Sequence, residues 1–290
     1  MTNQRALARA ATAVENATPE GLAHLASLTE ALAQGAGTVV GITGPPGAGK
    51  SSLVDALARE IRRRGKTVAI LAVDPSSRMT GGAILGDRIR MQQHHTDPGV
   101  FIRSMATRGA VGGLASATAN VAKLLRASGF DYVLVETVGV GQAEIEIAGL
   151  ADLTVLVLVP GMGDDVQALK SGIMEIAGIY VINKADHPGA DRTEQEIRAE
   201  VGAAPILRTV ATQGKGIEEL LTAIDQTPRI QRREVDPVAE AVKSVNEALR
   251  SFEQALKLKP GSMQLDHLAV RVADREAATL TVGGLKLNFL

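Results

Sequence analysis

The 290-residue sequence contains no cysteine, which excludes disulfide bonds and thiolate metal sites. It also lacks an excess of charge of either sign, because 31 basic and 32 acidic residues give a formal net charge of −1. A chain this close to neutrality has no broad field to attract nucleic acid or an anionic membrane, so we expect neither as a partner. The absence of cysteine fits a reducing compartment, and we expect a cytoplasmic location.

Long apolar runs are missing as well. No stretch of about 18 uncharged apolar residues occurs, which argues against a transmembrane helix. The N-terminal residues include Glu15, Glu20 and Glu30 and no continuous apolar core, unlike a secretory signal peptide. With 45% hydrophobic residues, the chain is long enough for one large domain and a smaller appendage.

Short β-branched segments alternate with helical patterns between Thr38 and about Asp225. Their apolar residues are nearly continuous, as in parallel strands that helices cover on both faces. The predicted strands are TVVGIT, TVAILAV, DYVLVE, LTVLVLV, IYVIN and PILRT. Residues 50–64 and 111–127 have apolar residues at helical spacing and predict crossover helices. The predicted fold class is therefore α/β, with a doubly wound, mostly parallel sheet.

Two further regions flank this predicted α/β domain, which spans residues 37–226. Residues 1–36 predict an N-terminal helical arm, in which Thr18 caps a helix that starts at Pro19. A Thr-Pro pair and a charged run break the pattern after the domain. Residues 227–290 are therefore interpreted as a linker and a small C-terminal tail, either α+β or helical.

The segment GPPGAGKS follows the first predicted strand directly and leads into a helix. Its residues are Gly44, Pro45, Pro46, Gly47, Ala48, Gly49, Lys50 and Ser51, and Ser52 completes the predicted nucleotide-binding set. A Gly-rich turn in this position lets backbone N–H groups surround a phosphate at the positive end of a helix. We expect Lys50 to reach the β- and γ-phosphates as the catalytic cation and Ser51 to bind Mg²⁺. This motif predicts a P-loop nucleoside triphosphatase.

Three acidic residues compete as further magnesium ligands. Glu136 ends the strand DYVLVE and begins Glu-Thr-Val-Gly, where P-loop GTPases usually have Asp-x-x-Gly. A carboxylate at this edge of the sheet is costly to bury without a cation. Asp74 follows the strand TVAILAV, and Asp87 lies in a Gly-Asp-Arg sequence. For these two, the alternative is a helix cap or an ion pair with Arg78 or Arg90.

The sequence Asn-Lys-Ala-Asp at the end of the strand IYVIN matches the Asn-Lys-x-Asp guanine motif. The Asp186 carboxylate can accept hydrogen bonds from guanine N1–H and the 2-amino group, which adenine does not offer, so the motif predicts GTP and GDP as ligands. We expect the stem of Lys184 to lie along the base and Asn183 to tie this loop to the phosphate loop. The region of Ala211 and Thr212 is predicted to supply a further backbone contact to the base.

Seven segments stand in a characteristic order: GPPGAGKSSLVDAL, VDPSS, TGGAILGDRIRM, DPGVFIRSMATRG, ETVGVGQAE, VPGMGDDVQALKSGIMEI and NKAD. Over about residues 3–225, the chain resembles the MeaB/ArgK-type GTPases, the bacterial counterparts of the human methylmalonic aciduria type A protein. The resemblance implies a homodimeric G-protein chaperone of adenosylcobalamin-dependent methylmalonyl-CoA mutase. Such a chaperone gates cofactor loading, protects or reactivates the mutase, and hydrolyses GTP slowly on its own.

The resemblance also implies roles for individual residues. Those that match the magnesium site of the family are Ser51, Asp74, Asp87 and Glu136. Residues 81–91, 136–148 and 161–170 would be three switch segments, with Gln142 in the second and Asp164, Gln167 and Lys170 in the third. From the residues alone, a solvated surface loop is the favoured interpretation of segment 161–170, and only the resemblance favours a switch. Gln142 lies three residues beyond Gly139, so it cannot be equated with the water-orienting Gln of Ras-like proteins.

The tail and the function class leave alternatives open. Residues 235–290 resemble the opening βαβββ module of a vicinal-oxygen-chelate protein such as methylmalonyl-CoA epimerase. Pro237 stands where the first metal-binding His is usual, and a second module is missing, so we expect no epimerase activity. The tail could instead serve packing or dimerisation. The alternative functions are a metal-insertion GTPase, whose Cys- or His-rich segments are not found in this sequence, or a chaperone of another acyl-CoA mutase.

Overall fold

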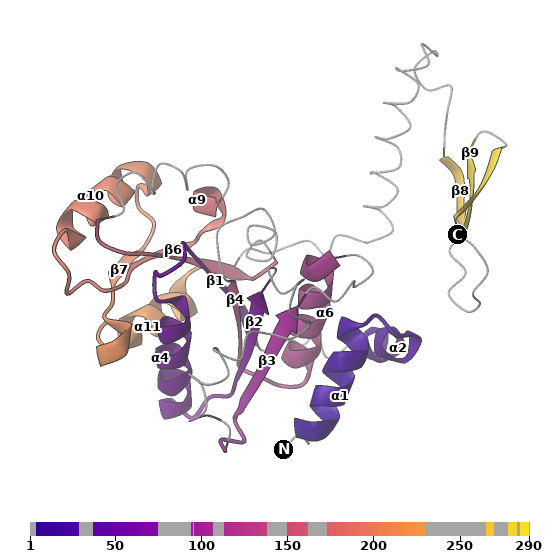
Figure 1. The fold of residues 1–290 in the computed structure, drawn as a ribbon, viewed down its shortest axis with the longest axis horizontal. Coiled ribbons are helices and arrows are strands. Elements are labelled where there is room, and N and C mark those ends of the chain that lie inside the picture. Colours follow the sequence, from indigo (N-terminus) through magenta and orange to yellow (C-terminus); the bar gives the residue numbers. More distant parts are fainter. Residues whose placement is uncertain are drawn as a thin grey trace, which may run out of the picture. The chain divides into compact units, whose positions relative to one another are not determined.

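The computed structural model describes ten parts of the chain and shows how they form two compact units (Figure 1). The described residues are 4–28, 37–74, 94, 96–106, 113–137, 150–161, 173–229, 265–269, 278–282 and 285–289. The first unit comprises residues 1–230 and the second residues 231–290. The two units are described separately below.

The first unit is built on a seven-stranded sheet in the order β3-β2-β4-β1-β5-β6-β7, and every neighbouring pair is parallel. The strands are β1 Thr38–Thr43, β2 Val68–Asp74, β3 Val100–Ala106, β4 Tyr132–Thr137, β5 Leu153–Leu158, β6 Ile179–Ile182 and β7 Ile206–Arg208. The first strand lies in the middle, and later strands are added on both sides of it. This order confirms the doubly wound α/β fold class.

Helices connect these strands and precede them. They are α1 Gln4–Glu15, α2 Pro19–Ser27, α4 Lys50–Arg63, α6 Gly113–Ala127, α9 Ile173–Ile176, α10 Ala190–Val201 and α11 Ile217–Gln226, with a 3₁₀ helix, η3, at Ala211–Gln213. The Thr18 hydroxyl accepts a hydrogen bond from the Gly21 N–H at 3.2 Å, so it caps α2 as its sequence position predicts. Among the described residues, none of the helices is both long and apolar enough to span a membrane.

The strands bury side chains on both faces of the sheet. Alternate residues such as Ile42, Ile70 and Leu134 pack with α4 and α11 in one buried cluster. Their neighbours, such as Leu71 and Val133, pack with α1 and α6 in a second cluster. Figure 1 shows α4 and α11 on one side of the sheet and α1 and α6 on the other. This double coverage explains why the strand sequences are almost continuously apolar.

Strand β3 is the element of this sheet that the sequence analysis missed. It forms one edge, and its sequence VFIRSMA interrupts the apolar pattern with Arg103 and Ser104. Arg103 is nevertheless largely buried, because its guanidinium forms an ion pair with Glu15 and donates a hydrogen bond to the Thr12 hydroxyl at 3.1 Å. Helix α1 therefore supplies the polar partners that allow a charged residue in this strand.

The second unit contains a three-stranded antiparallel sheet in the order β10-β9-β8. Its strands are β8 Leu265–Ala269, β9 Ala278–Val282 and β10 Leu285–Phe289. Any helix of the tail lies outside the described residues. The resemblance of the tail to a vicinal-oxygen-chelate module therefore stays a prediction.

Replacing Leu57 by Ala should reveal how strongly the α4 face depends on close packing. Leu57 is part of α4 and its side chain is fully buried, so the change removes apolar contacts and leaves a cavity. We expect the free energy of unfolding to fall by about 2–5 kcal/mol in urea denaturation. Leu22→Ala, at a residue that is 42% exposed on α2, is the matched control and should shift stability by about 0.5 kcal/mol or less. Equal losses in both variants would contradict this description of the core.

Candidate functional site

The phosphate loop connects the carboxyl end of β1 to the first turn of α4. Gly44 has φ +145°, and a Cβ there would lie 2.1 Å from the Val157 carbonyl oxygen. Gly49 has φ +88°, and a Cβ there would lie 2.4 Å from Asn183 Nδ2. Both positions combine a left-handed backbone with a close approach, so only glycine fits them. The two glycines bring the loop against β5 and against the strand end that carries Asn183.

Lys50 is buried at the N-terminal end of α4. Its Nζ donates hydrogen bonds to the carbonyl oxygens of Gly44 at 2.7 Å and Pro45 at 3.0 Å. The loop therefore holds the ammonium group within its own curve, next to the positive end of the helix. An anion in this curve would meet the charge of Lys50 and the helix N-terminus together.

Ser51 and Glu136 meet beside the phosphate loop. The Ser51 hydroxyl donates a 2.5 Å hydrogen bond to Glu136 Oε1, and the Glu136 side chain is buried. The register explains the contact, because Glu136 in β4 is paired with Ile42 in β1 and with Ala72 in β2. Hydroxyl and carboxylate oxygens are the hard ligands that Mg²⁺ prefers, so this pair fits the predicted metal site.

The remaining predicted metal and switch residues are only partly described. Asp74 ends β2, two residues beyond Ala72, so the strand end lies at the same edge of the sheet as Glu136. Its side chain is not among the described parts. Asp87, Gln142, Asp164, Gln167 and Lys170 lie outside the described residues, and their roles stay predictions.

Asn183 joins three segments at the end of β6. Its Nδ2 donates to the Ala48 carbonyl of the phosphate loop at 2.9 Å. Its Oδ1 accepts from the Thr209 hydroxyl at 3.0 Å and from the Ala211 N–H at 3.2 Å. The side chain is 2% exposed, so these bonds are shielded from water and costly to break. The predicted guanine loop and phosphate loop are therefore held at a fixed separation.

The other residues of the predicted guanine site surround this amide. Lys184 has φ +55° and donates from Nζ to the Gly47 carbonyl at 2.9 Å, so its stem crosses from β6 to the phosphate loop. Asp186 and Thr212 are exposed, whereas Ala211 is buried. The N–H of Ala211, which belongs to the region predicted to contact the base, donates to Asn183 in this structure. The carboxylate of Asp186 is thus accessible to a ligand. The neighbouring Asn183 and Lys184 are hydrogen-bonded to the phosphate loop.

Two features of this site escaped the sequence analysis. The Thr209 hydroxyl is a hydrogen-bond donor to Asn183, and a second buried hydroxyl contact joins Thr137 to Thr43 at 3.1 Å. Thr43 is the last residue of β1 and Thr137 the last of β4. The sequence signal for these contacts was the position of each threonine. Thr43 and Thr209 end the predicted strands TVVGIT and PILRT, and Thr137 directly follows the predicted strand DYVLVE. The significance of these positions depends on which strands are neighbours, which the local pattern does not reveal.

The histidine at position 94 has a local partner. His94 is buried, and its Nε2 lies 2.8 Å from Asp55 Oδ1 on α4, while Asp55 also forms a 2.8 Å ion pair with Arg59. Within the described ranges, no three His, Cys, Asp or Glu side chains come together as a metal site. The contact with Asp55 attaches His94 to the phosphate-loop helix.

Comparisons with known proteins place the chain among GTPases. The family model described as methylmalonyl-CoA mutase-associated GTPase MeaB matches residues 7–255. A Pyrococcus abyssi protein whose name describes a GTPase is 45% identical to this chain. The alignment is 295 positions long and covers 94% of this chain and 89% of that protein. The mouse protein named methylmalonic aciduria type A homolog, mitochondrial, is 39% identical over 193 residues, or 62% of this chain and 46% of that protein.

A solved structure extends the comparison to the fold. The hydrogenase maturation factor HypB from Archaeoglobus fulgidus gives a TM-score of 0.53 with 21% identity, over 70% of this chain and 96% of that protein. At this identity the likeness concerns the fold alone.

Asn183→Ala tests the importance of the buried amide. The change leaves the Ala48 carbonyl and the Thr209 hydroxyl without their partner in a region that water does not reach. We expect the free energy of unfolding to fall by about 2–4 kcal/mol and the affinity for GDP to fall at least about tenfold. Denaturation and calorimetric titration would measure these changes. Thr212→Ala, at an exposed position of the same loop, should preserve stability. Wild-type stability and affinity in Asn183→Ala would contradict the role assigned to the amide.

Proposed function

The chain belongs to the MeaB family of GTPases, and on that premise we propose that it is a GTP-dependent chaperone of an adenosylcobalamin-dependent methylmalonyl-CoA mutase. The family model, described as mutase-associated, supports the choice of partner. The nucleotide part rests on one observation above all, the buried Asn183 amide that joins the predicted guanine loop to the phosphate loop. The proposed role is to gate cofactor loading and to protect or reactivate the mutase.

The reaction is hydrolysis of GTP by water to GDP and phosphate. The phosphate loop binds the triphosphate through its backbone N–H groups and the positive end of α4. Lys50 is already held at the loop by its bonds to Gly44 and Pro45, so its charge needs little reorganisation to stabilise the transferring phosphoryl group. Water attacks the γ-phosphorus, and the bond to the β–γ bridging oxygen breaks.

Ser51 and Glu136 would hold Mg²⁺, because they bring a hydroxyl and a buried carboxylate together at 2.5 Å. We propose Asp74 and Asp87 as the further acidic residues of this site. When bound, Mg²⁺ supplies positive charge that offsets the charge developing on the phosphate oxygens. The chain's own part is to align the two oxygen donors on neighbouring elements, β4 and the first turn of α4.

The residues that we assign to the described site, Lys50, Ser51 and Glu136, serve phosphate and metal binding, and none of them is assigned to the attacking water. We propose that hydrolysis is slow in the isolated protein. The mutase would order the predicted switch segments and in this way orient the attacking water. We propose that four residues of these segments link binding of the mutase to hydrolysis: Gln142, Asp164, Gln167 and Lys170. We further propose a homodimer that acts in the cytoplasm.

Hydrolysis in the presence and absence of the partner tests this proposal. An adenosylcobalamin-dependent methylmalonyl-CoA mutase from the same host should raise the rate of GTP hydrolysis at least about tenfold, because it orders the segments near the γ-phosphate. The rate of phosphate release measures the effect, and the Lys50→Ala variant controls for contaminating GTPase. Equal rates with and without mutase, together with failure to retain the mutase in a GTP- or GDP-loaded pull-down, would overturn the chaperone proposal.

Asp186→Asn tests the assignment of the base. The amide nitrogen would face the N1–H and 2-amino donors of guanine, so we expect GDP affinity to fall by about 10–100-fold. Xanthosine diphosphate should bind better to the variant than GDP does, because its C2 carbonyl accepts from an amide. Asp191→Asn, at an exposed aspartate on α10, should keep the preference for GDP. Unchanged selectivity in Asp186→Asn would exclude Asp186 as the residue that recognises guanine.

A further inference from the structure

Two helices that pack against each other follow parts of the nucleotide site. These parts are the phosphate loop and the region of Ala211 that is predicted to contact the base. Helix α4 begins at the end of the phosphate loop, and α11 begins shortly after η3. Ala48 of the phosphate loop and Ala211 of η3 belong to the same buried cluster as the facing apolar residues of α4 and α11. The phosphate loop therefore precedes one helix of a packed pair, and the region of Ala211 precedes the other.

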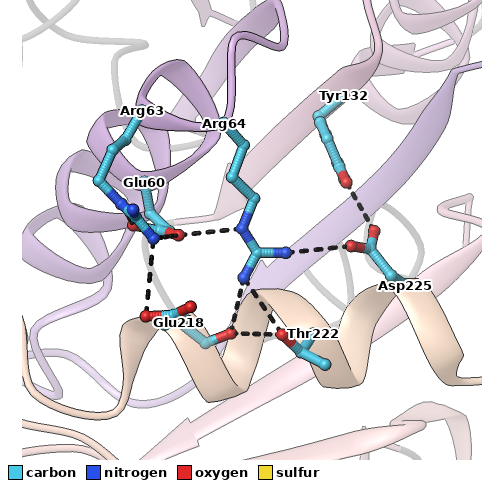
Figure 2. A network of polar contacts seen from close by, with 7 residues as sticks. All are labelled: Glu60, Arg63, Arg64, Tyr132, Glu218, Thr222 and Asp225. Carbon is cyan, nitrogen blue, oxygen red and sulfur yellow. Dashed lines mark hydrogen bonds and ion pairs between the residues drawn. The ribbon is translucent and has the colours of Figure 1, made fainter.

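The C-terminal end of α4 is joined to α11 by polar contacts, which Figure 2 shows. Arg64, the residue that follows α4, donates from Nη2 to the Glu218 carbonyl at 3.0 Å and to the Thr222 hydroxyl at 3.1 Å. Its Nη1 lies 3.4 Å from Asp225 Oδ2, and its Nε donates to Glu60 at 2.9 Å. One planar guanidinium thus contacts three successive turns of α11 while it is anchored on α4.

Asp225 also fixes α11 to the sheet. The Tyr132 hydroxyl, at the start of β4, donates to Asp225 Oδ1 at 2.6 Å. Burial raises the pKa of Tyr132, and the hydrogen bond to Asp225 raises it further, so the phenol stays a donor at neutral pH. Arg64 and Tyr132 therefore hold the two oxygens of one carboxylate from different elements. These contacts oppose sliding of α11 along α4.

The neighbouring Arg63 makes contacts of a different kind. It bonds mainly to Glu60 on its own helix, and its distance to the Glu218 carboxylate is 3.6 Å. Its side chain is 62% exposed, compared with 27% for Arg64. An exposed pair within one helix contributes little to stability. Arg63 is therefore a natural control for Arg64, because it carries the same charge in the same network without bridging the helices closely.

We propose that Arg64 is a positioning residue for guanine recognition, which fixes α11 along α4 and thereby helps to place the Ala211 region relative to the phosphate loop. The proposal rests on the proposed function, because it takes the region of Ala211 and Asp186 as the base site. Arg64 touches no nucleotide: the 14 residues of α4 place it about 21 Å from the phosphate loop at about 1.5 Å per residue. A nucleotide that bridges both loops has a fixed length, so an axial shift of one helix weakens the base contacts first.

The test compares a ligand that spans both loops with one that occupies only the phosphate loop. Arg64→Met keeps the apolar stem and removes the guanidinium contacts. We expect its dissociation constant for GDP to rise about tenfold and that for pyrophosphate to change less than about twofold. Isothermal titration calorimetry on the full chain measures both. Arg63→Met should change neither constant by more than about twofold.

Further variants distinguish positioning from general destabilisation. Arg64→Lys keeps the charge but cannot form the forked contacts, so it should restore GDP affinity only in part. Thr222→Val removes one contact and leaves Arg64 in place, and it should weaken GDP in the same direction by a smaller factor. Equal weakening of GDP and pyrophosphate in Arg64→Met, or no weakening of GDP, would overturn the proposal.

The proposed function is judged separately on the wild-type protein. A wild-type chain that binds GDP no better than ADP would refute the base assignment itself, whatever the Arg64 variants do. A clear preference of the wild type for GDP, with unaltered GDP affinity in Arg64→Met, would refute only the role of Arg64.

Discussion

The nucleotide site depends on one buried amide, that of Asn183. Its donor side holds the phosphate loop at Ala48, and its acceptor side holds Thr209 and the Ala211 N–H. Three segments from distant parts of the sequence thus share one small group whose hydrogen-bonding capacity is used in both directions. Since the group is 2% exposed, water cannot replace a lost partner, and any shift of one loop costs the bonds of the others. The backbone of Gly49 also lies close to this amide, so the phosphate loop has little space to move toward it.

The parallel sheet explains why the phosphate and metal groups meet. All seven strands run the same way, so their carboxyl ends lie at one edge, where an open α/β sheet binds its ligands. Glu136 lies between Ile42 of β1 and Ala72 of β2, which brings its carboxylate to the Ser51 hydroxyl on the first turn of α4. The proposed metal site would therefore depend on strand order and register as much as on the two residue types.

Local patterns predict the parts of this fold whose signal is contained in one segment. The six continuous apolar strands and the Thr18 cap belong to this class. Strand β3 could not be predicted, because Arg103 breaks its apolar pattern and the compensating Glu15 lies 88 residues away. The role of Thr209 was hidden for the same reason, since its partner Asn183 belongs to another strand end. The motif residues could be named from sequence, but the bonds that hold them depend on tertiary neighbours.

Binding of guanine cannot by itself distinguish GTP from GDP or accelerate hydrolysis. Contacts to the base are the same before and after the reaction, so they lower the free energy of both states equally. Only groups near the γ-phosphate can favour one state, and among the described residues we propose Lys50, Ser51 and Glu136 for this position. Glu136 is followed by Thr137, whose hydroxyl donates to Thr43 where the phosphate loop begins. The end of β4 thus connects the proposed metal ligand Glu136 to the strand that leads into the phosphate loop.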